Sequence, residues 1–447
     1  MVSSKLIQLT PNEALIVYGY NHRMLYKTIW ALDKIISLLI IGVIITGDLP
    51  RITNQTDQVR QYTSAIEFDY PNWVWDAIWT KIDQSAISAP YTFNRGSNKQ
   101  IVFEYLHATN ELDQTNLQIE KIFSDPKVVD KESTSSYLRA QRDQLAARQA
   151  ALAPFAESIL QSQVNNTLAE LGLTTGGQTL PPILYRNSPT PLALIVSPRD
   201  HVEQTTNISI LPDLTLDQQI KLEDDVAKSL NVSTLIVPVG GIGVYPTMVE
   251  ETTDLPWMLS TISHEWTHNY LNLRPLGINY STTPELRTMN ETTASISGDE
   301  VGHLVLQKYY PELVASTSNQ NLIRFDLSLP PSTRLADTPP FDFRAEMHTT
   351  RVEADNLLAQ GKVTEAESYM EQRRQLFLQN GYLIRKLNQA YFAFYGAYAD
   401  IPGGAAGEDP VGPAVRALRT QSKSLADFIN TIAWMTSFKQ LQQAIKK

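Results

Sequence analysis

Two histidines and a glutamate near the middle of the chain form the pattern with the clearest chemical meaning. They are His264, Glu265 and His268, in a chain with only 7 histidines among 447 residues. Residues four apart share one face of an α-helix, so the imidazoles of His264 and His268 can point at one metal ion. Glu265 lies one residue further round, where its carboxylate can hold a water without ligating the ion. The H-E-x-x-H spacing therefore predicts a zinc centre, the alternative being two histidines buried in a helical core.

A catalytic zinc site needs a third protein ligand and one open position. Glu291 follows His268 on a second expected helix, at a distance that suits a helix-turn-helix returning to the ion. Three other acids compete for this role, namely Glu285, Asp299 and Glu300. Asp299 also lies two turns after Glu291 on the same helical face, where it could instead orient a ligand histidine. We favour Glu291 as the third ligand.

These motifs together resemble the gluzincins, zinc peptidases with H-E-x-x-H on one helix and N-E-x-x-A or a similar motif on the next. The second motif here is Asn290–Ala294, which reads NETTA. The resemblance implies that His264, His268 and Glu291 bind one Zn²⁺ ion and that Glu265 is the general base of amide hydrolysis. The glycine-and-histidine continuation of the metzincins does not follow His268.

A second resemblance involves the aromatic stretch Leu387–Tyr398, which reads LNQAYFAFYGAY. Together with the N-E-x-x-A segment it is similar to bacterial proteins classed as predicted aminopeptidases, although the N-terminal helices depart from them. The resemblance implies a peptide or protein substrate and leaves open whether cleavage is at the N-terminus or internal. Gluzincins commonly supply a tyrosine or histidine that stabilises the developing oxyanion. Tyr398 is the first candidate, followed by Tyr395 and His348.

The helix that must carry the two histidines is well marked at both ends. It is expected over Leu255–Leu273, with Asp254 as its N-cap and Pro256 in its first turn. Pro275 and Gly277 are expected to end it. Its remaining surface is rich in tryptophan, leucine and isoleucine, which predicts that most of the helix is buried.

The rest of the chain predicts a predominantly helical α+β fold whose zinc cleft lies between a small sheet and helices. Strands are expected at 183–185, 192–197, 207–211 and 234–239, and helices at 100–123, 134–171 with a break near Pro154, 214–230, 304–313, 343–358, 363–379, 382–398 and 424–445. The glycine-rich segment 240–243 is expected either to form the edge of the cleft, where substrate backbone can approach closely, or to be a plain turn.

The N-terminal part contains an apolar stretch that predicts a transmembrane anchor at 29–49. Lys27 and Lys34 precede its longest apolar run, which favours a cytoplasmic N-terminus and an extracytoplasmic catalytic domain in a single-pass, bacterial membrane protein. A cleaved signal peptide and a buried soluble helix are the alternatives. The aromatic residues between 70 and 79 are expected either at the bilayer interface or in an ordinary core.

Composition and boundaries complete the prediction. The chain is expected to comprise a cytoplasmic segment (1–28), the anchor (29–49), an extracytoplasmic helical region (50–175) and a zincin-like metallopeptidase domain (176–447). The net charge of -10 argues against a nucleic-acid partner, and the lack of cysteine excludes disulfides and thiol catalysis. The alternative function is a non-catalytic, membrane-tethered scaffold with a structural or vestigial metal site.

Overall fold

The computed structural model describes residues 54–85, 95–124, 127–174, 176–317, 341–398 and 404–446. The chain divides into two units, residues 1–58 and residues 59–447, and the fold below is that of the second unit. The predicted membrane anchor at 29–49 lies outside the described residues. Among the helices that are described, none is long and apolar enough to cross a membrane.

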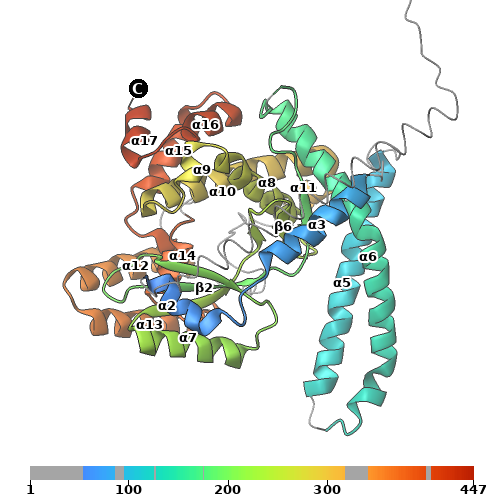
Figure 1. The fold of residues 1–447 in the computed structure, drawn as a ribbon, viewed down its shortest axis with the longest axis horizontal. Coiled ribbons are helices and arrows are strands. Elements are labelled where there is room, and N and C mark those ends of the chain that lie inside the picture. The colour runs from blue at the N-terminus through green and yellow to red at the C-terminus, as the bar shows by residue number, and fades with distance from the viewer. Residues whose placement is uncertain are drawn as a thin grey trace, which may run out of the picture. The chain divides into compact units, whose positions relative to one another are not determined.

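The described chain is predominantly helical with two small sheets, as the sequence predicts (Figure 1). Its helices are α2 (Gln55–Thr63), α3 (Tyr70–Ser85), α5 (Arg95–Ser124), α6 (Lys131–Glu170), α7 (Leu216–Leu230), α8 (Leu255–Asn272), α9 (Pro275–Ile278), α10 (Pro284–Tyr309), α11 (Pro311–Thr317), α12 (Phe343–Ala359), α13 (Val363–Gln379), α14 (Gln389–Tyr395), α15 (Val411–Gln421), α16 (Leu425–Ile432) and α17 (Phe438–Ala444), with a 3-10 turn, η2, at Gly404–Ala406. Its strands are β1 (Tyr185–Asn187), β2 (Leu192–Ser197), β3 (Thr206–Ile210), β4 (Ser233–Pro238), β5 (Gly241–Ile242) and β6 (Thr247–Val249).

The larger sheet has the antiparallel order β3-β2-β4 and is covered on both faces. Side chains alternate along β2, so Ala193 and Ile195 face one side while Leu194 and Val196 face the other. The first pair packs in a cluster with residues of α12, α13 and α14. The second pair packs with Leu222 and other residues of α7. The larger sheet therefore lies between α7 on one face and α12, α13 and α14 on the other.

The smaller sheet, β1-β6-β5, lies beside the helix that carries the two histidines. β1 and β6 are parallel, and β5 pairs antiparallel with β6 at the edge. The sequence did not predict β5 or β6 because they are two and three residues long. Strands this short contain too little alternation to be recognised from the sequence.

The helices α8 and α10 pack against each other at the centre of the main hydrophobic core. Asp254 caps α8 by accepting a hydrogen bond from the Trp257 N–H at 3.0 Å, which confirms the predicted start of this helix. The two backbones approach closely where α10 has glycine. A Cβ on Gly302 would lie 2.8 Å from the backbone nitrogen of Ser260, so a larger residue there would push the helices apart.

The predicted break near Pro154 is wrong, because α6 runs without interruption from Lys131 to Glu170. Tertiary contacts hold the helix on both sides of the proline. Before it, Gln149 donates a 3.2 Å hydrogen bond to the Thr109 hydroxyl of α5. After it, Ile159 is buried in the main core. These contacts offset the hydrogen bond that the proline ring removes.

The prediction of one helix over 382–398 is also wrong, since only α14 is helical there. The residues before α14 run beside β4. Arg385 donates to both carboxylate oxygens of the buried Glu223 at 2.8 and 2.5 Å and to the Ile236 carbonyl at 3.0 Å. Because these hydrogen bonds hold Arg385 against β4 and α7, the residues around it do not form a helix.

The predicted terminal helix over 424–445 is divided into α16 and α17. The backbone N–H of Leu276 donates to the Ala433 carbonyl at 3.0 Å, at the residue where α16 ends. This contact from α9 takes a carbonyl that a continuing helix would use for its own hydrogen bond.

We expect Gly302→Val to destabilise the protein by about 1–3 kcal/mol, because the added side chain overpacks the contact between α8 and α10. The free energy of unfolding in urea measures this change. Leu304→Val, on the exposed side of the same helix, is the control and should change that free energy little. Equal effects of the two substitutions would show that the close contact does not limit stability.

Candidate metal centre

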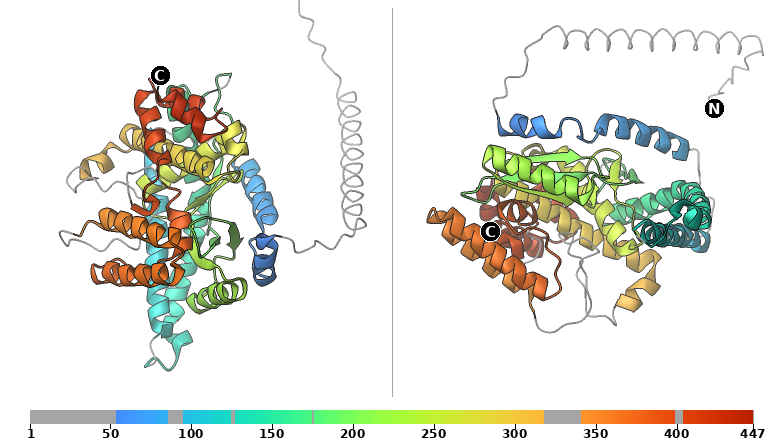
Figure 2. Two further views of the ribbon diagram at one scale, coloured as in Figure 1. Left: turned by 90° about the vertical axis from the view of Figure 1, so that its left-hand side faces the viewer. Right: turned by 90° about the horizontal axis from the view of Figure 1, so that it is seen from below.

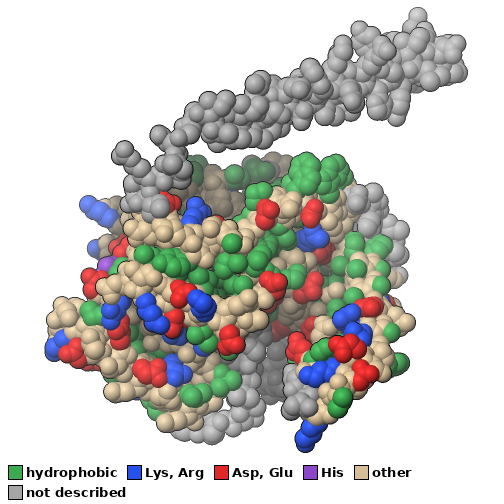
Figure 3. Space-filling model, turned by 60° about the horizontal axis from the view of Figure 1, so that its bottom comes forward, with side chains coloured by type: hydrophobic (Ala, Val, Ile, Leu, Met, Phe, Trp, Pro, Cys, Tyr) green, Lys and Arg blue, Asp and Glu red, His purple; other side chains and the backbone are tan. Residues whose placement is uncertain are grey.

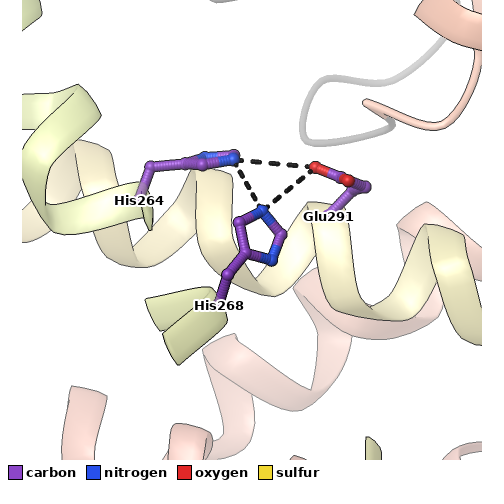
Figure 4. Close-up of side chains that lie close together, drawn as sticks. All are labelled: His264, His268 and Glu291. Carbon is purple, nitrogen blue, oxygen red and sulfur yellow. Dashed lines mark hydrogen bonds and ion pairs between the residues drawn. The ribbon is translucent and has the colours of Figure 1, made fainter. Parts of the chain in front are cut away.

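Three side chains from α8 and α10 converge on one point (Figure 4). The Nε2 atoms of His264 and His268 are 3.0 Å apart. The Oε2 atom of Glu291 lies 3.6 Å from His264 Nε2 and 3.4 Å from His268 Nε2. All three residues lie within the buried interior or at its edge. The structure thus brings together the two histidines and the glutamate that the sequence singles out.

The dimensions of this triangle suit a zinc ion. A tetrahedral ion with ligands about 2.0–2.1 Å away places its ligand atoms about 3.3 Å from each other. The three edges observed here, 3.0, 3.4 and 3.6 Å, bracket that value. Glu291 Oε2 is also a buried oxygen without a hydrogen-bond partner among the described residues. Buried polar atoms without partners are costly, and a cation at this point would supply the missing interaction.

The charges within the triangle also favour a cation. Burial by itself would raise the pKa of Glu291, but the facing imidazoles of His268 and His264 outweigh it and hold that pKa well below its usual range. Burial lowers the pKa of His268, and the Glu291 carboxylate outweighs it and raises that pKa to about 9. The carboxylate is therefore charged and draws positive charge to this point.

Neighbouring side chains orient the ligands. The Nδ1 atom of His268 lies 2.7 Å from Oδ1 of Asn290, the residue before Glu291. The Tyr280 hydroxyl donates a hydrogen bond to Glu291 Oε1, which leaves Oε2 facing the imidazoles. Contacts of this kind fix the rotamer of a metal ligand and the tautomer of a histidine. His268 and Glu291 thus each have a neighbour that holds the side chain in place.

Glu265 is buried next to the triangle, under the glycine-rich segment between β4 and β6. A Cβ on Gly241 would lie 2.8 Å from Glu265 Oε1, and one on Gly243 would lie 3.1 Å from the His268 Cβ. A side chain at Gly241 would therefore displace Glu265, and one at Gly243 would crowd His268. Burial raises the pKa of Glu265, an effect that the two imidazoles oppose. The segment borders the cleft, as one of the two sequence interpretations predicts.

A cleft of about 730 Å³ opens onto these residues. Tyr398 and Tyr395 both line it, and the Tyr398 ring stacks on His264 with centroids 6.3 Å apart and an interplanar angle of 28°. Burial, and next the nearby Glu291, raise the pKa of Tyr398 well above its usual value, so its hydroxyl keeps its proton. His348, the third candidate, is not among the cleft residues and lies 3.4 Å from the Glu408 carboxylate.

The competing third ligands lie elsewhere. Glu285 is exposed in the first turn of α10. Glu300 makes a bidentate ion pair with Arg419, at 2.7 and 2.8 Å. Asp299 is not part of the triangle, and the residue beside His268 Nδ1 is Asn290.

Sequence reasoning missed Tyr280 and Arg287. Tyr280 lies between the two motifs, and no spacing rule connects it to Glu291. Arg287 lies one turn before Glu291 on α10, lines the cleft, and donates to the Ala393 carbonyl at 2.9 Å. The four-residue spacing places Arg287 and Glu291 on one helical face, which is the signal that could have found it.

Comparisons with models of protein families, with curated proteins and with solved structures find no match to this chain.

We expect the purified protein to bind one zinc ion and Glu291→Ala to lower its zinc affinity strongly, because the triangle loses its only carboxylate. Glu285→Ala removes an exposed acid from the same helix and should leave the affinity unchanged. Competition with a chromogenic chelator measures both affinities. If the two variants bind zinc equally well, Glu291 is not a ligand.

Proposed function

We propose that this protein is a zinc-dependent peptidase that hydrolyses peptide bonds in peptides or proteins. One observation carries the proposal. Ligand atoms of His264, His268 and Glu291 lie within 4.8 Å of each other, with a further buried carboxyl group, Glu265, beside them in an accessible cleft. A structural zinc site has four protein ligands and no adjacent base. Three ligands with a carboxylate at the open side are the arrangement of a hydrolytic centre.

Zinc bound at these residues would polarise the scissile carbonyl and lower the pKa of the attacking water. Glu265 then acts as general base, taking the proton from the water and passing it to the leaving amine. Its burial suits this role, because a raised pKa makes the carboxylate a stronger base for the proton of the water. The Gly241 backbone above it limits the space around the carboxylate.

The developing oxyanion needs a hydrogen-bond donor, and Tyr398 is the candidate that the geometry supports best. It lines the cleft, stacks on His264 and keeps its hydroxyl proton. Tyr280 and Asn290 have a positioning role, because they hold Glu291 and His268 in their rotamers. Arg287 lies in the same cleft and adds positive charge to it.

Aminopeptidase activity is part of the proposal. Asp113, Glu250 and Glu251 line the same cleft as the zinc ligands. Carboxylates are the groups that pair with the α-ammonium of a free peptide N-terminus. We further propose that residues 29–49 anchor the chain in a membrane, with the N-terminus in the cytoplasm and the cleft on the other side.

We expect Glu265→Gln to lower peptide turnover about 10²–10⁴-fold while zinc binding is kept, because the general base is lost and the ligands are not. Turnover of peptides with free and with acetylated N-termini measures this, and loss of turnover on acetylation marks an aminopeptidase. Glu285→Gln is the control. A zinc-loaded Glu265→Gln protein that behaves like the wild type would favour the non-catalytic scaffold.

We expect Tyr398→Phe to lower kcat about 10²–10³-fold with little change in KM, because the hydroxyl donates only to charge that develops in the transition state. Steady-state kinetics on the same peptides measure the two constants. Tyr395→Phe, also in the cleft, is the matched control. A larger loss in the Tyr395 variant would reassign the donor.

A further inference from the structure

Helix α3 directs two of its polar residues, Lys81 and Gln84, inward. Lys81 is buried, and its ammonium group lies 2.6 Å from the carboxylate of Glu157 on α6. Gln84, one turn later, is also buried and donates to the same carboxylate at 2.8 Å. The other oxygen of Glu157 accepts from the Asn187 N–H at 2.9 Å. A lysine on this helix would ordinarily face water.

The opposite face of α3 is apolar and exposed. Trp75, Ile78, Trp79 and Ile82 are 60%, 38%, 51% and 51% exposed, and we call them the α3 stripe. Their spacing of three and four residues puts them in one row. The indole rings of Trp75 and Trp79 meet edge to face with centroids 5.7 Å apart. Apolar side chains gather at the upper right of the surface in Figure 3, on the side along which α3 runs in Figure 2.

This reversed polarity suits an apolar environment on the outer side of α3. A row of two tryptophans and two isoleucines, with a buried lysine behind it, is the inverse of a surface helix in water. Tryptophan is the side chain most enriched at the boundary between lipid and water, because its ring is apolar and its N–H is polar. The residue types of the α3 stripe therefore fit a lipid surface.

The sequence before α3 points to the same surface. The apolar segment that predicts a membrane anchor ends at Leu49, and α3 begins at Tyr70. The connecting residues include α2, which rises only about 1.5 Å per residue, and the others span at most about 3.3–3.6 Å each, so α3 can lie at the face of a bilayer that holds the anchor. The stripe is also too small for a stable dimer. The stripe is a single row of four side chains along about 10 Å of helix. A stable interface buries about 800 Å² per partner, which is more than such a row offers.

We propose that the α3 stripe lies in the headgroup region of a lipid bilayer. Tyr70, the first residue of α3, lines the cleft, so this contact places the cleft close to the membrane surface. Asp76 is an exposed acid beside the stripe, so we expect the contact not to require anionic lipids. The proposal rests on the geometry of α3 and on the predicted anchor, and it does not depend on the metal site.

The test uses single cysteines in the full-length chain, which has no cysteine of its own. Ile78→Cys and Ile82→Cys place an environment-sensitive fluorophore on the stripe. Leu378→Cys is the matched control. It is 40% exposed, close to the 38% of Ile78, and α13 lies on the side of the unit away from α3 (Figure 2). The labelled proteins are reconstituted in phosphatidylcholine vesicles, with and without lipids that carry a nitroxide near the headgroup.

We expect a blue shift of the emission and quenching by the nitroxide lipids at both stripe positions, and neither effect at the control. Unchanged circular dichroism of each variant establishes that it is folded. Stripe probes that behave like the control overturn the proposal. A blue shift without lipid quenching also overturns it, because the stripe is then covered by a second copy or by another part of the chain.

Discussion

The close contact between α8 and α10 is the constraint on which the rest of the structure depends. One helix supplies both imidazoles and the other supplies the carboxylate, so their separation sets the two edges of the ligand triangle that join an imidazole to the carboxylate. Gly298 and Gly302 make this separation possible. A Cβ on Gly298 would lie 2.7 Å from the Ser260 carbonyl and 3.0 Å from the Cβ of His264. Because both glycines face α8, which carries the two histidines, the same contact controls the stability of the fold and the geometry of the three candidate ligands.

Small polar residues fill the same contact. Thr267 donates back to the Ser263 carbonyl of α8 at 2.8 Å, and its hydroxyl lies 2.9 Å from that of Ser297 on α10. The hydroxyls of Thr267 and Ser297 thus have partners, which limits the cost of placing them in a core. Short side chains of this kind allow closer backbones than leucine would.

Tyr398 reaches the candidate metal centre because the chain before it is held on the larger sheet. The ion pair between Arg385 and the buried Glu223 fastens the segment before α14 to α7 and β4. A buried carboxylate left without its partner is costly, so this pair strongly favours one placement of the chain. α14 then packs on the sheet, and Tyr398, three residues beyond its end, comes to lie against His264. The proposed oxyanion donor therefore depends on contacts far from the metal.

The residues of the candidate metal centre were predicted best where their relation is local. His264, Glu265 and His268 belong to one helix, and the four-residue spacing determines that the two imidazoles share a face. The start of α8 at Asp254 follows from capping in the same way. The predominantly helical fold class could also be predicted from the sequence, since helical periodicity covers most of the chain. The membrane anchor at 29–49 stays a prediction.

The sequence by itself determined that two histidines and an acid on the next helix could meet, because helix geometry is a local property. Only the tertiary structure decided that the acid is Glu291, since Glu300 is held by Arg419 and Glu285 faces solvent. The same holds for Tyr280 beside Glu291, for the edge strand β5 and for the outward face of α3. Each of these depends on contacts between segments far apart in the chain, and no short-range pattern encodes such contacts.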